Sequence, residues 1–483
     1  MGRGVAEMHR WLAGLLGPVM LVWFLSGLVM LRVPFPSLTE SEWFASAGVL
    51  DPESCCPSLE RIIDAVDRSQ GIESLRIILS GGRPVVVAQY LDGSLGSAWI
   101  DTLEPLAPFP EASAQRAAQA IAPGRAILSI ELIEDDVWTV HQRFNAHRPL
   151  WKVSVSGERE PVHYFSGTTG ELVQDTTVHE RRWNLVGSVP HWWYVPWLRR
   201  QWALWDRLLW WVGGAATLMM VAGTILLVRI LIRQTGGQSV AGGRTLHRML
   251  GLAGGASALA WMVSGWLSMD HGRIFSDGRI PALDRERAMG GRLTARDVES
   301  HKAEWTKAVS AGMAKELRVS KLAGSVYAIA RESADRQFMV SLAGAGESGY
   351  RVFPESLVRV AVGAMLGSVD GVTVRTITTE MRRQESVRSQ VDPVPVMQVK
   401  HDGRDARCID VDARTGAMLE QQDSSRRLYH RLFDSLHRWD VPWLVGHDEL
   451  RLFLMGLWCL LGVGLTLSGA WCRVRRRARV EGP

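Results

Sequence analysis

Four long uncharged runs dominate the pattern of apolar and polar positions along the chain. Each is 21 residues long and has a charged residue at both borders; they are Trp11–Leu31, Leu208–Val228, Met249–Met269 and Leu452–Cys472. A helix of this length covers about 30 Å, the thickness of the hydrocarbon core of a bilayer. The pattern therefore predicts four membrane-spanning helices.

The first run could instead be a signal peptide, because Ala45-Ser46-Ala47 resembles a cleavage site. That tripeptide lies 14 residues beyond the apolar run. The apolar core of a signal peptide is also usually shorter, about 7–15 residues. We therefore expect the first span to be retained.

The long segments between spans show the shorter periods of helices and strands. In the first segment, 58–70 and 112–121 have helical spacing, and strand patterns cover 72–82, 83–93, 126–134, 150–157 and 161–173. In the second, 356–366 predicts a helix, and 394–403 and 407–419 predict a terminal hairpin. The predicted fold is a membrane bundle of four helices with two α+β extracytoplasmic domains.

Arginines predict the orientation of the chain in the membrane. They gather before the first span, between the second and third spans, and after the fourth: Arg3, Arg10, Arg229, Arg233, Arg244, Arg248, Arg473, Arg475, Arg476, Arg477 and Arg479. The positive-inside bias then places both termini in the cytoplasm. The predicted order is span 1 (1–31), outer domain 1 (32–207), span 2 (208–228), cytoplasmic connection (229–248), span 3 (249–269), outer domain 2 (270–451), span 4 (452–472) and an arginine-rich tail (473–483).

The net charge of +5 and the pI near 9.1 follow from this topology and need no nucleic-acid partner. The five cysteines have no zinc or thioredoxin-type spacing. Cys55, Cys56 and Cys408 are predicted to face an oxidising compartment, where a disulfide can form. The sequence leaves their pairing open.

The chain also predicts an internal duplication. SVPHWWYVPWL at 188–198 and DSLHRWDVPWL at 434–444 match at the histidine, the following tryptophan and Val-Pro-Trp-Leu, 246 positions apart. Near the start of each half the offset is 238, where His9-Arg10 meets His247-Arg248. Each half then reads as span, outer domain, histidine motif and span.

His9-Arg10-Trp11-Leu12, VDARTGAML at 411–419, and Leu436-His437 before a Gly-rich span that ends in arginines resemble PepSY-associated transmembrane helix proteins. The resemblance covers nearly the whole chain. It implies PepSY-like outer domains and a bacterial inner-membrane location, often with iron regulation. Some members of this family are haem-containing reductases that release iron from ferric siderophores. The family's usual His-x-Gly is His-Trp-Trp and His-Arg-Trp here.

The repeated histidines are the main candidates for chemistry. In a pseudo-twofold bundle, His9 and His247 would approach the axis from opposite sides at the inner surface, as would His191 and His437 at the outer surface. Two neutral imidazoles on opposite faces of one iron are the axial ligands of a six-coordinate haem. The pattern predicts two haem b groups. Interfacial anchoring or helix packing is the alternative that the sequence leaves open.

Three further residues are weaker candidates for cofactor binding. His271 has Val33 as its repeat equivalent; it could replace an outer ligand, line a substrate surface, or lie in a solvated loop. Arg181 and Arg427 precede the outer histidines and could neutralise haem propionates or attract an anionic chelate. Interfacial snorkelling is their alternative. The proline of Val-Pro-Trp-Leu is expected to end the helix that carries each outer histidine.

The predicted function is a b-type haem protein that passes electrons across the membrane to reduce a ferric chelate outside. No dinucleotide fingerprint occurs, and the connection of about 20 residues is too short for a flavin or nicotinamide domain. Membrane quinol or a separate reductase would therefore be the electron donor. The alternative is a membrane-anchored binding or regulatory protein for a peptidase or transporter. Transport is weaker, because the spans lack internal charges, and the oligomeric state stays open.

Overall fold

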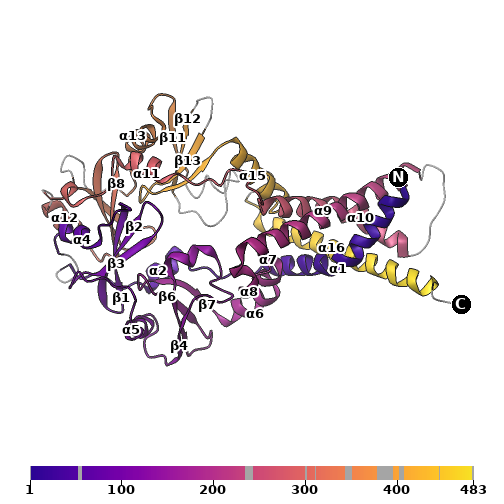
Figure 1. The fold of residues 1–483 in the computed structure, drawn as a ribbon, viewed down its shortest axis with the longest axis horizontal. Helices are drawn as coiled ribbons and strands as arrows, with labels where there is room; N and C mark the ends of the chain where they lie inside the picture. The colour runs from indigo at the N-terminus through magenta and orange to yellow at the C-terminus, as the bar shows by residue number, and fades with distance from the viewer. Residues whose placement is uncertain are drawn as a thin grey trace.

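The computed structural model describes residues 2–52, 57–233, 243–299, 302–310, 312–342, 351–377, 395–401, 407–444 and 446–480. Four long helices form a bundle, and antiparallel sheets gather at one end of it (Figure 1). The N-terminus lies at the other end of the bundle. Cys55 and Cys56 fall outside the described residues, so a disulfide among Cys55, Cys56 and Cys408 stays a prediction with its pairing open.

The four bundle helices confirm the predicted membrane spans. They are long and apolar enough to cross a membrane, and they are α1 (Gly2–Met30), α9 (Trp202–Arg233), α10 (Gly243–Ser268) and α16 (Asp448–Val480). Their lengths of 29, 32, 26 and 33 residues exceed the predicted 21. The helical hydrogen bonding continues into the flanking polar and aromatic residues, which apolar runs alone do not reveal.

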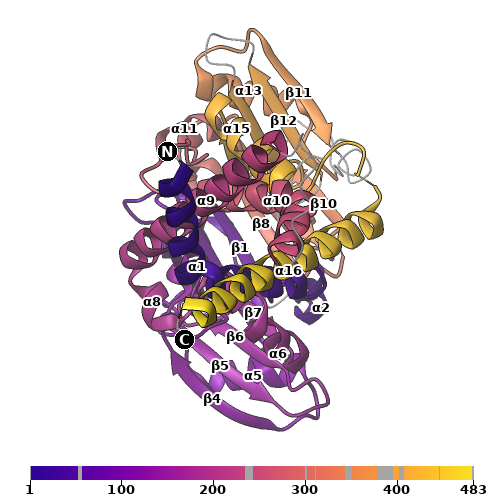
Figure 2. The same cartoon turned by 90° about the vertical axis from the view of Figure 1, so that its right-hand side faces the viewer.

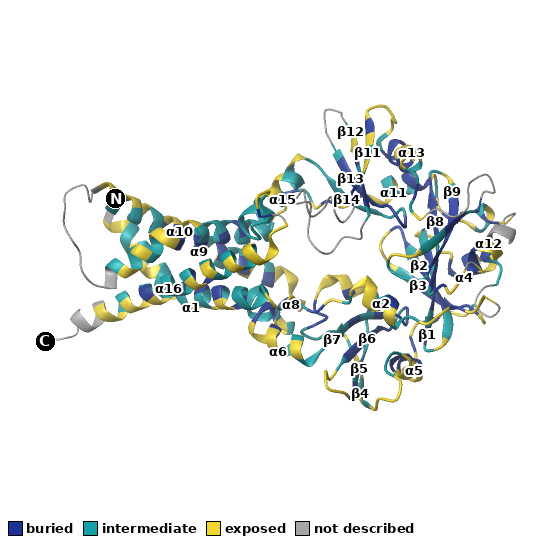
Figure 3. Ribbon diagram, turned by 180° about the vertical axis from the view of Figure 1, so that it is seen from behind, coloured by how far each residue is buried: buried dark blue, intermediate teal, exposed yellow. Residues whose placement is uncertain are grey.

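The outer surface of the bundle is apolar. Large side chains such as Trp11 (74% exposed), Trp211 (72%) and Phe453 (65%) point away from the other helices, and much of the bundle surface is exposed or intermediate, whereas the sheets have buried interiors (Figure 3). Apolar surface of this extent is unfavourable in water and marks contact with lipid or protein. We conclude that the chain is a membrane protein.

The packing order of the helices places α1 and α10 at opposite corners of the bundle. α1 packs against α9 and α16, and α10 packs against the same two helices; Figure 2 looks along the bundle from the end that carries the termini. Buried side chains fill the middle, with the rings of Phe24 and Trp261 6.2 Å apart across the diagonal. Residues of α1 and α10 therefore meet near the bundle axis.

A six-stranded antiparallel sheet lies farthest from the bundle (Figure 1). Its order is β10-β9-β8-β1-β2-β3, with β1 (Ile72–Ser80), β2 (Arg83–Tyr90), β3 (Leu95–Trp99), β8 (Glu316–Leu322), β9 (Ser325–Arg331) and β10 (Gln337–Ser341). Because β1 pairs with β8, residues of 32–207 and 270–451 share one sheet. The sequence does not reveal this link between the two predicted outer domains.

Each half also has a four-stranded antiparallel sheet of its own. One is β4 (Ile127–Ile133), β5 (Leu150–Val155), β6 (Val162–Ser166) and β7 (Leu172–Thr176); the other is β11 (Val372–Ile377), β12 (Val396–His401), β13 (Arg407–Asp412) and β14 (Met418–Gln422). The helices beside the sheets are α2 (Glu40–Ser46), α4 (Leu59–Val66), α5 (Glu111–Ile121), α11 (Ala282–Met289), α12 (Lys302–Val309) and α13 (Glu355–Leu366). These elements confirm the predicted helices and strands of both segments.

Short helices connect the four-stranded sheets to the bundle. In the first half these are α6 (Val178–Val186), α7 (Ser188–Trp192) and α8 (Pro196–Arg200), and in the second half the connection is α15 (Ser424–Leu436). Thr177 and Asp423 cap the first turns of α6 and α15 through side-chain oxygens. Each sheet thus leads directly into the segment that carries an outer histidine.

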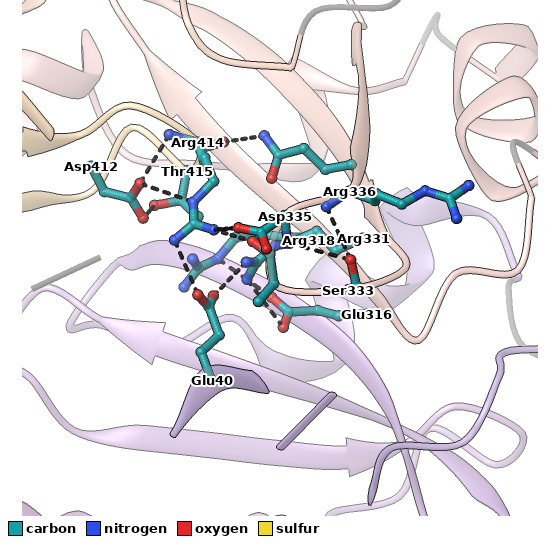
Figure 4. Close-up of polar contacts among 12 residues, drawn as sticks. Glu40, Glu316, Arg318, Arg331, Ser333, Asp335, Arg336, Asp412, Arg414 and Thr415 are labelled. Carbon is teal, nitrogen blue, oxygen red and sulfur yellow. Dashed lines mark hydrogen bonds and ion pairs between the residues drawn. The ribbon is translucent and has the colours of Figure 1, made fainter. Parts of the chain in front are cut away.

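An ion-pair cluster with buried arginines and the exposed Glu40 fastens α2 to the second half of the chain (Figure 4). The carboxylate of Glu40 accepts hydrogen bonds from Arg331 on one oxygen and from Arg414, at 3.0 Å, on the other. The two arginine side chains are only 5% and 7% exposed. Glu316 lies 3.7 Å from Arg331 and adds a second negative charge. Arg414 belongs to the VDARTGAML turn, which gives that motif a structural role here.

We expect Glu40→Gln to lower the stability of this junction. The substitution keeps the size of the side chain but leaves two buried guanidiniums short of a counter-charge, at a cost of about 2 kcal/mol. Thermal unfolding of the purified full chain measures the loss. Glu104→Gln, at an exposed position, is the matched control, and equal melting temperatures for both variants would contradict the expectation.

Candidate functional site

The bundle brings together the two histidines that lie farthest from the sheets. His9 comes from α1 and His247 from α10, and their ring centres are 6.5 Å apart. We call them the distal pair. Because α1 and α10 occupy opposite corners, the two rings meet across the bundle.

Hydrogen bonds fix the tautomer of both distal rings. Nδ1 of His9 lies 3.0 Å from the carbonyl oxygen of Met219, and Nδ1 of His247 lies 3.2 Å from that of Leu465. A carbonyl only accepts, so each Nδ1 must carry the proton. Ser468 Oγ, 2.9 Å from the same Nδ1 of His247, donates to Leu465 O and can accept as well. Each Nε2 therefore keeps its lone pair.

The second histidine pair lies at the end of the bundle nearest the sheets. His191 sits in α7, and His437 is the residue that ends α15. Their ring centres are also 6.5 Å apart, with the planes at 71°. We call them the proximal pair. The structure thus brings together both pairs that the repeat predicts.

Serines fix the tautomer of the proximal rings. Nδ1 of His191 lies 3.0 Å from Ser26 Oγ, and Nδ1 of His437 lies 3.1 Å from Ser264 Oγ. Both hydroxyls donate to the carbonyl three residues earlier in their own helix, so they accept from Nδ1–H. Within the described residues, no hydrogen bond reaches Nε2 of any of the four histidines.

Tryptophans hold the backbone of the proximal pair. Trp23 Nε1 donates to the carbonyl oxygen of His191 at 3.1 Å, and Trp261 Nε1 donates to that of His437 at 3.0 Å. A buried indole N–H requires such an acceptor. The two tryptophans therefore serve the histidines directly, besides filling the core of the bundle.

A left-handed tryptophan lies two residues after each proximal histidine. Trp193 has φ 53° and Trp439 has φ 56°, a conformation that costs energy for a bulky residue. The predicted stop at the proline is wrong, because α7 already ends at Trp192 and Pro196 begins α8 instead. Proline suits the first turn of a helix, where its missing N–H is not needed.

A glycine on a neighbouring helix faces each of the four rings. A Cβ added at Gly223 would lie 2.9 Å from His9 Cε1, and one at Gly469 would lie 3.2 Å from His247 Cε1. The corresponding distances are 3.7 Å for Gly27 beside His191 and 3.4 Å for Gly265 beside His437. Side chains larger than glycine would crowd the rings, most severely at the distal pair.

The contacts repeat with the offsets that the sequence predicts. Histidines, serine or carbonyl acceptors, tryptophans and glycines occupy positions 238 or 246 residues apart: His9/His247, Met219/Leu465, Gly223/Gly469, Trp23/Trp261, Ser26/Ser264, Gly27/Gly265 and His191/His437. Unrelated packing contacts would not be expected to give the histidines of the two halves equivalent partners. The two halves of the chain therefore have matching imidazole environments.

Burial keeps the proximal rings neutral. It lowers the pKa of His191 to about 4. Burial, with the neighbouring His191 as a smaller contribution, also lowers the pKa of His437 to about 4. Neutral imidazole is the form that binds a metal.

The spacing of the rings fits an iron between them. Each metal–nitrogen bond is about 2 Å and each ring adds about 1 Å, so two imidazoles on one metal have centres about 6 Å apart. The described residues hold no group of three or more His, Cys, Asp or Glu that could bind a metal ion. A haem supplies four nitrogen ligands itself and needs only the two axial imidazoles.

The remaining predicted residues lie apart from these rings. His271 binds Asp206 through Nδ1 at 2.5 Å and lies beside Trp210. Arg181 donates to Thr176 O and Arg427 to Gln422 O, both at 3.1 Å. The two arginines thus bind the backbone of the strands that precede α6 and α15. Within the described residues, no hydrogen bond or ring contact joins His271 or Arg181 to either histidine pair.

Sequence reasoning missed the acceptors and the glycines of the distal pair. Ser26-Gly27 and Ser264-Gly265 coincide in the repeat and could have been assigned to the proximal pair. Gly223 and Gly469 match at the offset of 246, which was a usable signal. The carbonyl acceptors of the distal pair carry no side-chain signal at all.

Comparison of the sequence with models of known protein families gives no match, and no curated protein matches it. The resemblance to PepSY-associated transmembrane helix proteins therefore stays a prediction.

We expect Trp23→Phe and Trp261→Phe each to lose one hydrogen bond to a histidine carbonyl, about 1 kcal/mol. Trp261→Phe should lose more, because Trp261 also stacks on Trp439 at 5.7 Å. Thermal unfolding of the purified chain tests this order, with Trp11→Phe at the exposed surface as the control. Unchanged stability in both variants would contradict the assigned role.

Proposed function

We propose that this chain is a bacterial inner-membrane b-type haem protein that passes electrons across the bilayer to reduce a ferric chelate on the outer side. The observation that carries the proposal is the presence of two histidine pairs, one at each end of the bundle, with ring centres 6.5 Å apart in both.

The separation of the pairs supports a route across the membrane. His9 and Ser26, which binds His191, are 17 residues apart on α1. At 1.5 Å per residue this corresponds to about 26 Å, close to the thickness of the hydrocarbon core. One pair would therefore lie near each surface, with Phe24 and Trp261 in the interior between them.

His9 with His247 would hold one haem, and His191 with His437 the other. A bound haem supplies an iron that takes up and gives out one electron at a time. The protein's part is to present Nε2 by donating from Nδ1 to a carbonyl or serine, to exclude water with apolar helices, and to leave room beside each ring with glycine. Partners of the Nδ1 proton also raise the basicity of the ligand.

The proposal also includes the orientation of the chain in the membrane and the arrangement of its two halves. The arginines at both termini and between α9 and α10 favour a cytoplasmic location for the distal pair. The repeated contacts support an internal duplication, in which each half contributes one PepSY-like outer domain and one histidine to each pair. The sheets would then face the extracytoplasmic side, beside the proximal pair.

The substrate class is a ferric chelate such as a siderophore, as the family resemblance implies. One electron converts the bound ferric ion to ferrous, for which such chelators have a lower affinity, and the iron is released. The electron donor would be membrane quinol or a separate reductase.

A reduced-minus-oxidised visible spectrum of the purified chain tests the proposal. We expect b-type bands that weaken by about half in each of His9→Ala, His247→Ala, His191→Ala and His437→Ala, because each variant removes one axial ligand of one haem. His447→Ala, at an exposed position in the same part of the molecule, should keep the full spectrum. A colourless protein prepared with haem available would favour the anchored binding protein instead.

The glycines give a second test that leaves every ligand in place. Gly223→Ala brings a methyl group to 2.9 Å from His9 and should displace that ring, whereas Gly27→Ala places it at 3.7 Å from His191, an ordinary contact. We expect the haem content per chain to fall by about half in Gly223→Ala and to stay unchanged in Gly27→Ala. Equal haem contents would argue against ligation by His9.

A further inference from the structure

A cavity of about 240 Å³ lies at the sheet end of the bundle, between the start of α9 and the loop that follows α10. It takes no part in either histidine pair. Its wall includes Trp202 and Met269 as apolar side chains, and Asp206, Asp270, Arg273 and Arg279 as charged ones. Two carboxylates and two guanidiniums balance, so the lining favours a neutral ligand that both donates and accepts hydrogen bonds.

Asp206 is the most specific feature of this wall. Its side chain is 13% exposed, and its Oδ2 accepts a hydrogen bond from His271 Nδ1 at 2.5 Å. The ring of His271 packs on Trp210 at 5.4 Å, and Trp210 packs on Trp266 at 4.6 Å. A carboxylate held in this way inside an aromatic wall is a strong acceptor for a hydroxyl group of a ligand.

The internal repeat does not account for this site. Leu452 is the repeat equivalent of Asp206, and Val33 is that of His271. The four haem-ligand candidates occur in both halves, whereas the Asp206–His271 pair occurs in one. A residue pair required only for packing the twofold bundle would be expected in both halves. The Asp206–His271 pair therefore points to a function that only one half of the chain carries.

The wall of the cavity is connected to the proximal histidines. Trp205 Nε1 donates to the carbonyl oxygen of Trp192, the residue after His191, at 3.0 Å. Met269, which lines the cavity, packs against the cluster that contains Trp193 and Trp205. One indole hydrogen bond and apolar packing thus connect the wall of the cavity to the segment that carries His191.

We propose that this cavity binds the ring of a membrane quinol. A quinol ring is neutral, aromatic and hydroxylated, so it can donate to Asp206, accept from an arginine and pack on Trp202. The cavity lies at the start of α9, one of the candidate membrane spans, where the apolar tail of such a ligand can continue into the lipid. The choice of a redox ligand rests on the proposed haem chemistry, with electrons entering at the proximal pair in place of transfer across the whole bilayer; the binding site itself does not rest on it.

Equilibrium binding of decyl-benzoquinol, kept reduced under anaerobic conditions, to the full chain in phosphatidylcholine nanodiscs tests the proposal. We expect saturable binding that weakens about tenfold or more in Asp206→Leu, which copies the residue of the other half and removes an acceptor of charged hydrogen bonds. Asp135→Asn is the matched control, because Asp135 also pairs with an arginine nearby, at 2.9 Å from Arg200, but lines no part of the cavity.

Unchanged affinity in Asp206→Leu, or no saturable binding by the unmodified chain, would overturn the proposal. If Asp206→Leu melts early, Asp206→Asn, which keeps the shape of the side chain, decides by the same criterion. Loss of binding when phosphatidylglycerol replaces phosphatidylcholine would assign the cavity to a lipid headgroup and also overturn it. Haem spectra of the same samples separate the two proposals, since haem without benzoquinol binding removes only this one.

Discussion

A histidine ring has two nitrogens, and the described residues provide a hydrogen-bond partner for only one of them at each of four positions. Nδ1 of His9 reaches a carbonyl and that of His191 a serine hydroxyl, and their repeat equivalents do the same. A polar atom inside an apolar bundle is costly without a partner. Because the four free nitrogens belong to rings that meet in pairs, one bound group per pair can satisfy both nitrogens at once. Room for such a group accounts for the glycines that face the rings, for the proton on each Nδ1 and for the 6.5 Å between ring centres.

The sheets determine where the proximal pair can lie. At the centre of the six-stranded sheet, Arg76 lies directly opposite Arg318, an arrangement of like charges that is unfavourable unless it is neutralised. Glu171 bonds to Arg76, and Glu316 lies 4.0 Å from Arg318. The sheet therefore joins the two halves through compensated charges. The chain of each half then returns through a four-stranded sheet to a capped helix, which delivers one histidine to the bundle.

The sequence predicted the elements and the pairing of the histidines, but not the details that place them. The length of the apolar runs predicted the spans. The repeated sequence motif predicted that His191 would lie close to His437, because a duplicated bundle has a twofold relation. The pairing of β1 with β8 was not predictable, since strand register between distant segments has no local signal. The left-handed Trp193 was also missed: tryptophan has no intrinsic preference for that conformation, which only the surrounding contacts stabilise. The sequence shows that His271 has no histidine at its repeat position, but it did not predict the hydrogen bond of His271 to Asp206.

The twofold relation exchanges the two histidines within each pair, so it leaves the two ends of the bundle chemically different. This difference between the ends can give electron transfer a direction. The distal Nδ1 protons face carbonyls, whereas the proximal ones face serine hydroxyls that are weaker acceptors; partners of this kind tune the basicity of an axial ligand and thereby the potential of its iron. Asp206 and His271 add a second asymmetry, since one half alone has them. In the proposed protein, the duplication supplies two matched ligands at each site, and the difference between the two ends of the bundle acts on the potentials of the two irons.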